Sequence, residues 1–220
     1  MSVRSLHKPV HLFRYCAGLV LCLPIFCFFI YPKVIYYSYS PKVGDVIFQS
    51  LNRSSDLVRA IEGVTGSQIS HCGILVEKNN SWYVNEAYGP VHSTPLSKWI
   101  ERGRGYWFSV YRLKAEYKNV IPQVVSELEK YQGKPYDSRY RLDDEKIYCS
   151  ELVFKAFRDA TDENLGQLEE LGQLNWKPYK TTIEKYENGP VPLDRKMITP
   201  LGLSQSEKLN HVISLGIPGL

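Results

Sequence analysis

Cys149, His71 and Glu86 have the side-chain types of a thiol nucleophile, a general base and an orienting carboxylate. A free thiol is mostly protonated near neutral pH, whereas the thiolate is the species that attacks a carbonyl carbon. An imidazole held by a carboxylate keeps one tautomer and, once protonated, stabilises a thiolate beside it. We therefore predict that Cys149 attacks, that His71 takes its proton, and that Glu86 orients and charges His71.

Cys149 stands where a polar loop, residues 141–146, gives way to apolar residues at helical spacing. This pattern predicts a helix over 149–160 with Cys149 at its start. The unpaired N–H groups and the positive dipole end of a helix N-terminus both favour thiolate. The N–H of Cys149 is then an expected oxyanion donor, and the Tyr148 side chain is our candidate for a second donor. Taken alone, Cys149 equally fits a small buried core residue.

His71 and Glu86 lie on two predicted strands joined by a turn at Asn79-Asn80. A two-residue loop there pairs His71 with Tyr88 and places Glu86 diagonally across on the same face. A loop at Lys78-Asn79 would place Glu86 directly opposite His71. A three-residue loop would instead separate the two side chains.

Other readings of these residues stay open. His92 is the alternative orienter if Glu86 points away, and His71 and Glu86 taken singly fit ordinary strand positions. Cys72 follows His71 in a strand, so we expect it to face the core, away from Cys149, which argues against a disulfide between them. A metal site built from His71 and Cys149 lacks further clustered ligands, so we predict no metal and no cofactor.

The elements that position these residues are short strands and helices. The 220 residues suit one domain plus an additional segment. The predicted strands are 44–49, 70–77, 81–88 and 106–113, and the predicted helices are 57–62, 95–102, 117–131, 149–160 and 181–187.

The additional segment is an apolar run from Tyr15 to Tyr31 that extends to Tyr37. Its length is at the short end for a membrane span, and no small-residue cleavage site follows it. We favour an uncleaved anchor over a removed signal. The expected organisation is a basic cytoplasmic segment (1–14), an anchor or signal (15–37), a linker (38–42) and a folded domain (43–220).

Charge gives the expected orientation. Residues 1–40 contain four basic residues and no acidic one, while the rest of the chain has 23 of each. Basic residues before the apolar run predict a cytoplasmic N-terminus and a domain outside the membrane. We expect a single-pass inner-membrane protein with its domain in the periplasm. The neutral domain carries no electrostatic footprint for nucleic acid.

Several motifs resemble the YiiX/YebB-like proteins, which are circularly permuted papain-like cysteine hydrolases related to the NlpC cell-wall peptidases. The resemblance covers about residues 41–209. Its motifs are Gly44-Asp45-Val46-Ile47, Ser70-His71-Cys72-Gly73-Ile74, Asn85-Glu86-Ala87, Gly133-Lys134-Pro135-Tyr136-Asp137, Tyr148-Cys149-Ser150-Glu151-Leu152-Val153 and the tail from Pro192 to Pro200.

The resemblance implies an α+β fold with a permuted papain-like core, in which an antiparallel sheet packs on helices. It implies the chain order histidine, acid, cysteine, which His71, Glu86 and Cys149 follow. It implies cleavage of an amide or ester through an acyl-cysteine intermediate. Relatives include cell-wall peptidases and lecithin-retinol acyltransferases, so the expected substrates are peptidoglycan stem peptides or N-acyl and lipid compounds in the cell envelope. The alternative is a catalytically silent papain-like module that binds lipid or peptide.

Overall fold

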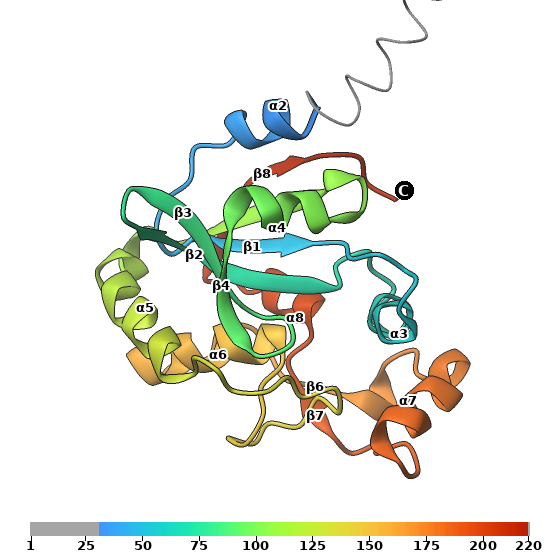
Figure 1. Cartoon of the computed structure of the whole chain (residues 1–220). Coiled ribbons are helices and arrows are strands. Elements are labelled where there is room, and N and C mark those ends of the chain that lie inside the picture. Colours follow the sequence, from blue (N-terminus) through green and yellow to red (C-terminus); the bar gives the residue numbers. More distant parts are fainter. Residues whose placement is uncertain (1–30, 220) are drawn as a thin grey trace, which may run out of the picture.

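An antiparallel sheet forms the centre of the molecule in the computed structural model, which describes residues 31–219 (Figure 1). Within that range six strands follow the order β4-β3-β2-β1-β5-β8, and a short β6-β7 pair lies apart from them. The strands are β1 (Val46–Gln49), β2 (His71–Lys78), β3 (Ser81–Ala87), β4 (Val91–Pro95), β5 (Phe108–Leu113), β6 (Glu169–Glu170), β7 (Lys196–Met197) and β8 (Leu209–Leu215).

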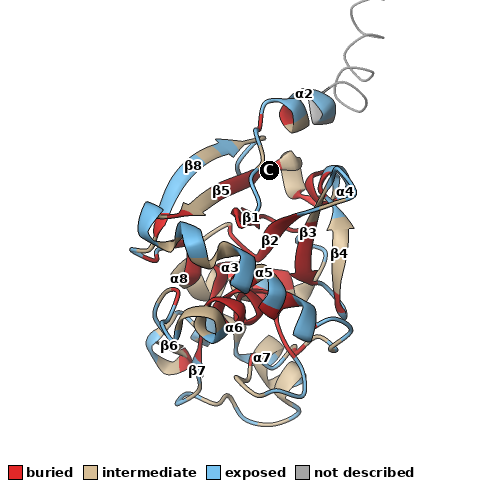
Figure 2. Ribbon diagram, turned by 90° about the vertical axis from the view of Figure 1, so that its left-hand side faces the viewer, coloured by how far each residue is buried: buried red, intermediate tan, exposed pale blue. Residues whose placement is uncertain are grey.

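Helices cover both faces of the sheet (Figures 1 and 2). The face with α5, α6 and α8 forms the larger core, while α2 and α4 cover the opposite face in a smaller cluster around Trp99. The α-helices are α2 (Tyr31–Tyr37), α3 (Asp56–Thr65), α4 (Leu96–Arg102), α5 (Ile121–Lys130), α6 (Cys149–Thr161), α7 (Lys180–Glu187) and α8 (Pro200–Ser204). Four 3-10 turns connect them within the described range: η2 (Arg104–Tyr106), η3 (Ala115–Val120), η4 (Leu171–Gln173) and η5 (Lys177–Tyr179).

The β2–β3 hairpin has the two-residue loop predicted from the sequence. Asn79 and Asn80 adopt φ values of 51° and 56°, and Lys78 pairs with Ser81. Asparagine tolerates this left-handed backbone better than most residues, and the turn matches strand twist. The register places Glu86 diagonally across from His71 on one face of the sheet.

Two strands of the six-stranded sheet were missed from the sequence, as were the short β6 and β7. We predicted a turn at Gly89-Pro90 and a helix over 95–102, and α4 confirms the helix, but β4 occupies Val91–Pro95 between them and pairs Glu86 with His92. The C-terminal β8 pairs with β5 at the other edge. Both are edge strands whose residues are largely half-buried or exposed, so neither carries a strong apolar alternation. The predicted helix 117–131 divides into η3 and α5.

The N-terminal prediction falls mostly on residues 1–30, which lie outside the described residues. In the described part, no helix has the length and apolar character needed to cross a membrane. The last residues of the predicted anchor, 31–37, form α2, which packs on α4. Ile35 and Tyr39 are buried against the sheet in the cluster around Trp99. The Tyr39 hydroxyl also donates a hydrogen bond to Asp45, so this segment is fastened to the domain.

Candidate active site

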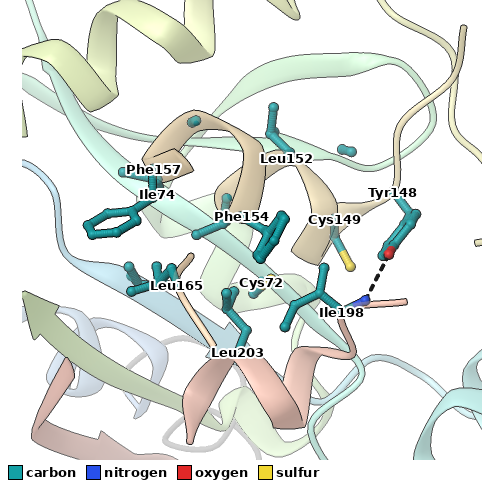
Figure 3. Close-up of a cluster of buried hydrophobic side chains, with 14 of the residues drawn as sticks. Cys72, Ile74, Tyr148, Cys149, Leu152, Phe154, Phe157, Leu165, Ile198 and Leu203 are labelled. Carbon is teal, nitrogen blue, oxygen red and sulfur yellow. Dashed lines mark hydrogen bonds between the residues drawn. The ribbon is translucent and has the colours of Figure 1, made fainter. Parts of the chain in front are cut away.

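Cys149 is the first residue of α6, as the sequence predicted (Figure 3). The Glu151 carboxylate accepts a hydrogen bond from the Tyr148 N–H at 3.2 Å and thereby defines the helix start. Burial raises the pKa of Glu151 to about 7, although Lys155 Nζ lies 2.8 Å away and opposes the rise. The main-chain N–H groups of the first helical turn lack intrahelical acceptors, so the Cys149 N–H is available to a developing oxyanion.

The Tyr148 side chain is not the second oxyanion donor that we predicted. It is fully buried, and its hydroxyl accepts a hydrogen bond from the Ile198 N–H at 3.0 Å. Figure 3 shows this side chain reaching the main chain of Ile198. Tyr148 therefore anchors the segment before α8 to the start of α6.

His71 meets Glu86 at the centre of the site. The His71 Nε2 lies 2.5 Å from Glu86 Oε2, and both side chains are buried. The imidazole packs edge-on against Tyr88, 5.7 Å between ring centroids, and lies beside Trp99. Nε2 faces Glu86, which leaves the other ring nitrogen for the interaction of His71 with Cys149.

The Glu86 carboxylate accepts hydrogen bonds from three further donors. Trp99 Nε1 and Arg102 Nη2 reach Oε2 at 2.9 and 2.5 Å, and the Thr94 hydroxyl reaches Oε1 at 2.5 Å. His92, our alternative orienter, lies 3.9 Å from Oε1 and bonds the Pro90 carbonyl through Nδ1 instead. The structure thus brings Glu86, rather than His92, into direct contact with the His71 ring.

Electrostatics in this site favour charged side chains. Burial acts to raise the pKa of Glu86, but hydrogen bonds and charges from His71 and Arg102 outweigh it and lower that pKa to about 2. Burial acts to lower the pKa of His71, but Cys149 and Glu86 outweigh it and raise that pKa to about 9. Both groups are therefore ionised at neutral pH.

The Cys149 thiol has a pKa well below its ordinary value. The largest cause is a hydrogen bond with the Cys72 side chain; burial opposes it, and the His71 hydrogen bond and charge add to the lowering. The directions of these pKa shifts favour a Cys149 thiolate paired with a His71 imidazolium, which is the reactive state of a cysteine nucleophile. The structure thus brings the three residues predicted for the site together.

Cys72 corrects one sequence expectation. It does lie on the strand face opposite His71, and both cysteines are free. However, α6 packs on that same face, so Cys72 and Cys149 share one core cluster and their side chains interact. The inference that they face apart was wrong because strand alternation says nothing about which element covers each face.

Tyr136 is a site residue that sequence reasoning missed. Its hydroxyl interacts with the Cys149 sulfur and lies 3.1 Å from the Tyr140 hydroxyl. Burial and the negative charge on Cys149 raise the pKa of Tyr136 well above its ordinary value, so it remains a donor. The available signal was its motif, Gly133-Lys134-Pro135-Tyr136-Asp137, which we used only as a mark of the family resemblance.

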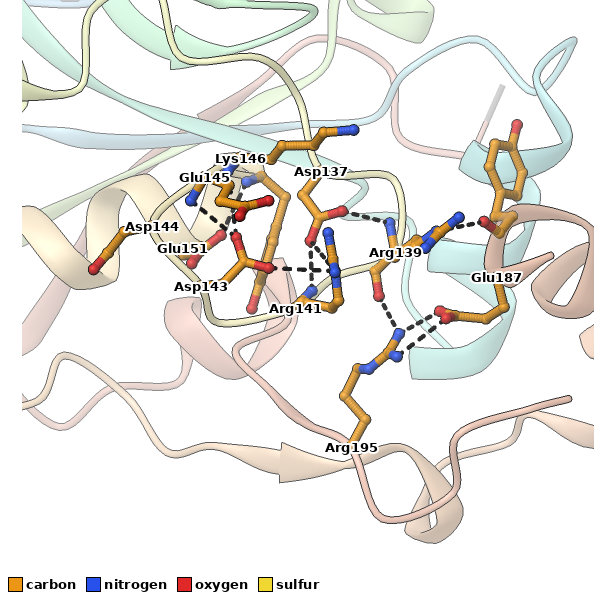
Figure 4. A network of polar contacts seen from close by, with 12 residues as sticks. Asp137, Arg139, Arg141, Asp143, Asp144, Glu145, Lys146, Glu151, Glu187 and Arg195 are labelled. Carbon is orange, nitrogen blue, oxygen red and sulfur yellow. Dashed lines mark hydrogen bonds and ion pairs between the residues drawn. The ribbon is translucent and has the colours of Figure 1, made fainter. Parts of the chain in front are cut away.

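The loop between Tyr136 and Cys149 is held by a polar network (Figure 4). Buried Asp137 accepts from the Arg139 and Arg141 N–H groups at 3.0 and 2.7 Å. Arg195 ties this loop to α7 by bonding the Arg139 carbonyl and Glu187. The network fixes the position of Tyr136 relative to the start of α6.

A cleft adjoins the site, and a second hollow lies next to that cleft. A cleft of about 250 Å³ is lined by His71, Tyr136 and Arg102, together with polar residues 52, 54 and 55. A narrower, almost wholly apolar hollow of about 70 Å³ lies between α3 and α7. Leu57 and Ile61 of α3 line both, so the two are neighbours. Cys149 itself is 0 % exposed and lines neither hollow.

Comparisons with known proteins identify the family of this chain. A family model for a permuted papain-like amidase enzyme, the YaeF/YiiX, C92 family, matches residues 40–213. The Escherichia coli (strain K12) protein YiiX is 32% identical over 179 residues, which cover 80% of this chain and 88% of that protein. A crystal structure of metalloprotein YiiX from Escherichia coli O157:H7 is similar with a TM-score of 0.76 and 30% identity, over 81% of this chain and all of that one.

The word metalloprotein describes that Escherichia coli chain. Within residues 31–219 of this chain, no three or more histidine, cysteine or acidic side chains are placed to hold a metal ion. Glu86 is already engaged by His71, Trp99, Arg102 and Thr94. The described residues therefore do not fit a metal centre, and no step below is routed through one.

Proposed function

Because the chain belongs to the permuted papain-like amidase family, we propose that it is a membrane-anchored cysteine hydrolase that cleaves an amide or ester. The observation that carries the proposal is the meeting of Cys149, His71 and Glu86 in one buried, charge-paired site. A silent binding module has no need for a low-pKa thiol beside an imidazolium.

The mechanism follows from the charges. The Cys149 thiolate attacks the carbonyl carbon, and the oxyanion is received by the Cys149 N–H and the Tyr136 hydroxyl. The His71 imidazolium then protonates the leaving amine or alcohol, leaving an acyl-cysteine. Neutral His71 next takes a proton from water, which attacks the acyl group, and the thiolate departs. Glu86 holds the ring and stabilises its charge throughout.

Two substrate classes have support. The apolar hollow that borders the cleft at Leu57 and Ile61 favours an N-acyl or lipid substrate, whose chain would lie against α3. The polar cleft wall with Arg102 favours a peptide with a carboxylate, such as a peptidoglycan stem peptide. We favour the acyl class because the hollow is apolar on nearly all sides.

The test is to trap the acyl-enzyme with p-nitrophenyl esters of short and long chain. Mass spectrometry of the full chain in detergent should show an acyl group on Cys149, more rapidly with the octanoate than the acetate. Ile61→Gln should remove that preference, while Val212→Gln on the exposed strand β8 should keep it. Release of muropeptides with no chain-length preference would favour the wall peptide. Absence of any acyl-Cys149 would favour the silent module.

Membrane attachment and a periplasmic location are part of the proposal. Basic residues precede the apolar run 15–31, and α2 packs directly on the domain, which would hold the domain beside the bilayer. Protease added to spheroplasts, whose outer membrane has been stripped, should digest the domain while the inner membrane is intact. Protection from protease until the inner membrane is lysed would contradict the orientation.

A further inference from the structure

Cys72 is a second thiol beside the nucleophile, and it takes part in no bond-making step of the mechanism above. It belongs to β2, whereas Cys149 opens α6, which packs over that strand. Both side chains are fully buried and neither is in a disulfide. The Cys72 thiol hydrogen-bonds the Cys149 sulfur, and its main-chain N–H does so as well. Two reduced cysteines thus face each other across one helix–strand contact.

The two thiols differ in protonation. Burial and the negative charge on Cys149 raise the pKa of the Cys72 thiol well above its ordinary value, whereas Cys149 is a thiolate. Oxidation by peroxide follows thiolate character, so it should begin at Cys149. A sulfenic acid formed there would have a protonated thiol in contact with it.

We propose that Cys72 is a resolving cysteine that closes a reversible Cys72–Cys149 disulfide when a peroxide oxidises the nucleophile. In the first step the Cys149 thiolate attacks one peroxide oxygen, the O–O bond breaks, and sulfenic acid and hydroxide form. In the second step the Cys72 sulfur attacks the Cys149 sulfur, the S–O bond breaks, and the disulfide and water form. A thiol reductant restores both thiols by exchange.

The disulfide would have two effects. It removes the nucleophile, so hydrolysis stops while the bond lasts. It also blocks further oxidation of Cys149 to sulfinic acid, which ordinary thiols do not reverse.

The inference rests on Cys149 being the reactive thiolate of the proposed function, but its test uses no substrate. The full chain in detergent is treated with hydrogen peroxide, quenched with catalase, divided with and without dithiothreitol, and labelled with iodoacetamide. Peptide mass spectrometry then assigns each cysteine. The same treatment is applied to Cys72→Ser, Cys72→Ala and Cys149→Ser.

In the wild type we expect a Cys72–Cys149 linked peptide and full return of Cys149 labelling after dithiothreitol. In both Cys72 variants we expect Cys149 sulfinic acid and at least a several-fold smaller return of labelling. In Cys149→Ser, Cys72 should stay reduced. Near-ultraviolet circular dichroism identifies any variant that has not folded, and two replacements of Cys72 guard against such a loss.

Two results would overturn the inference. One is wild-type Cys149 that passes to sulfinic acid as fast as in the Cys72 variants, with Cys72 still reduced. The other is a Cys149 disulfide with Cys16, Cys22 or Cys27 in place of Cys72. Failure of the hydrolase proposal appears elsewhere, as the absence of acyl-Cys149 with esters, so the two failures are distinguishable.

Discussion

Replacing Glu86 by glutamine removes the charge on which four donors converge while it keeps the size of the side chain. The His71 Nε2 lies 2.5 Å from this carboxylate, with Arg102 Nη2 at the same distance. A hydrogen bond to a charged group contributes about 1.5–3 kcal/mol. At roughly 1.4 kcal/mol for each pH unit, its loss should lower the pKa of His71 by about one to two pH units from its value of about 9.

The thiolate depends on this imidazolium, so the variant should lose reactivity on both sides of its pH profile. The lower limb, where Cys149 ionises, should move up by about one to two pH units, because a weaker imidazolium stabilises the thiolate less. The upper limb, where His71 loses its proton, should move down by a similar amount. Acylation by p-nitrophenyl acetate below neutral pH should fall about 10- to 150-fold, which is the same free energy expressed as a rate ratio.

The assay is stopped-flow release of p-nitrophenol from pH 5 to pH 10, with Glu101→Gln as a matched control on the exposed side of α4. The control should reproduce the wild-type profile. A Glu86→Gln profile with unmoved limbs, at any absolute rate, would refute the coupling of Glu86 to the ion pair. A fall in rate at all pH values without displacement would indicate that Glu86 acts only by positioning His71.

Three further results are expected. Tyr136→Phe should slow acylation about 10- to 100-fold through loss of an oxyanion donor, with binding of substrate little changed. A KM raised by the same factor with an unchanged kcat would contradict that role. Gly73→Ala should lower the urea midpoint by the equivalent of about 1–3 kcal/mol, because a Cβ there would lie 2.5 Å from Val84 Cγ1 and 2.7 Å from the Asn85 carbonyl oxygen. The free energy of unfolding of the wild type should fall by up to about 3 kcal/mol as pH drops from 4.5 to 2, because the pKa of Glu86 is lowered to about 2 and its contribution is lost on protonation. Urea titrations of Glu86→Gln should lack this component. An identical loss of stability in acid in both proteins would contradict it.

The start of the Cys149 helix and the contact of His71 with Glu86 could be predicted because their local signals are strong. The apolar spacing after Cys149 and the polar loop before it marked the helix start. The Asn79-Asn80 turn fixed the hairpin register, and with it the relation of His71 to Glu86. These inferences needed only residues close together in the chain.

The remainder depended on contacts between distant segments. Tyr136 contacts Cys149 because the loop that contains it folds back to the start of α6. Cys72 interacts with Cys149 because α6 packs on the face of the sheet that carries Cys72. Trp99 and Arg102 join Glu86 only once α4 has packed on the sheet. Strand alternation and helical spacing describe each element by itself, so they could not reveal these contacts between distant side chains.

The central claim is the Cys149–His71 ion pair, and the most direct test is the pH dependence of Cys149 alkylation. Limiting iodoacetamide is applied from pH 5 to pH 9 to the wild type, Cys149→Ala and His71→Ala, with each cysteine assigned by peptide mass spectrometry. We predict that Cys149 below pH 7 keeps most of the alkylation rate that it has at pH 9. The adduct should be absent in Cys149→Ala, and His71→Ala should lose the reactivity at low pH. A Cys149 that reacts only above about pH 8, with the same profile whether or not His71 is present, would contradict the account.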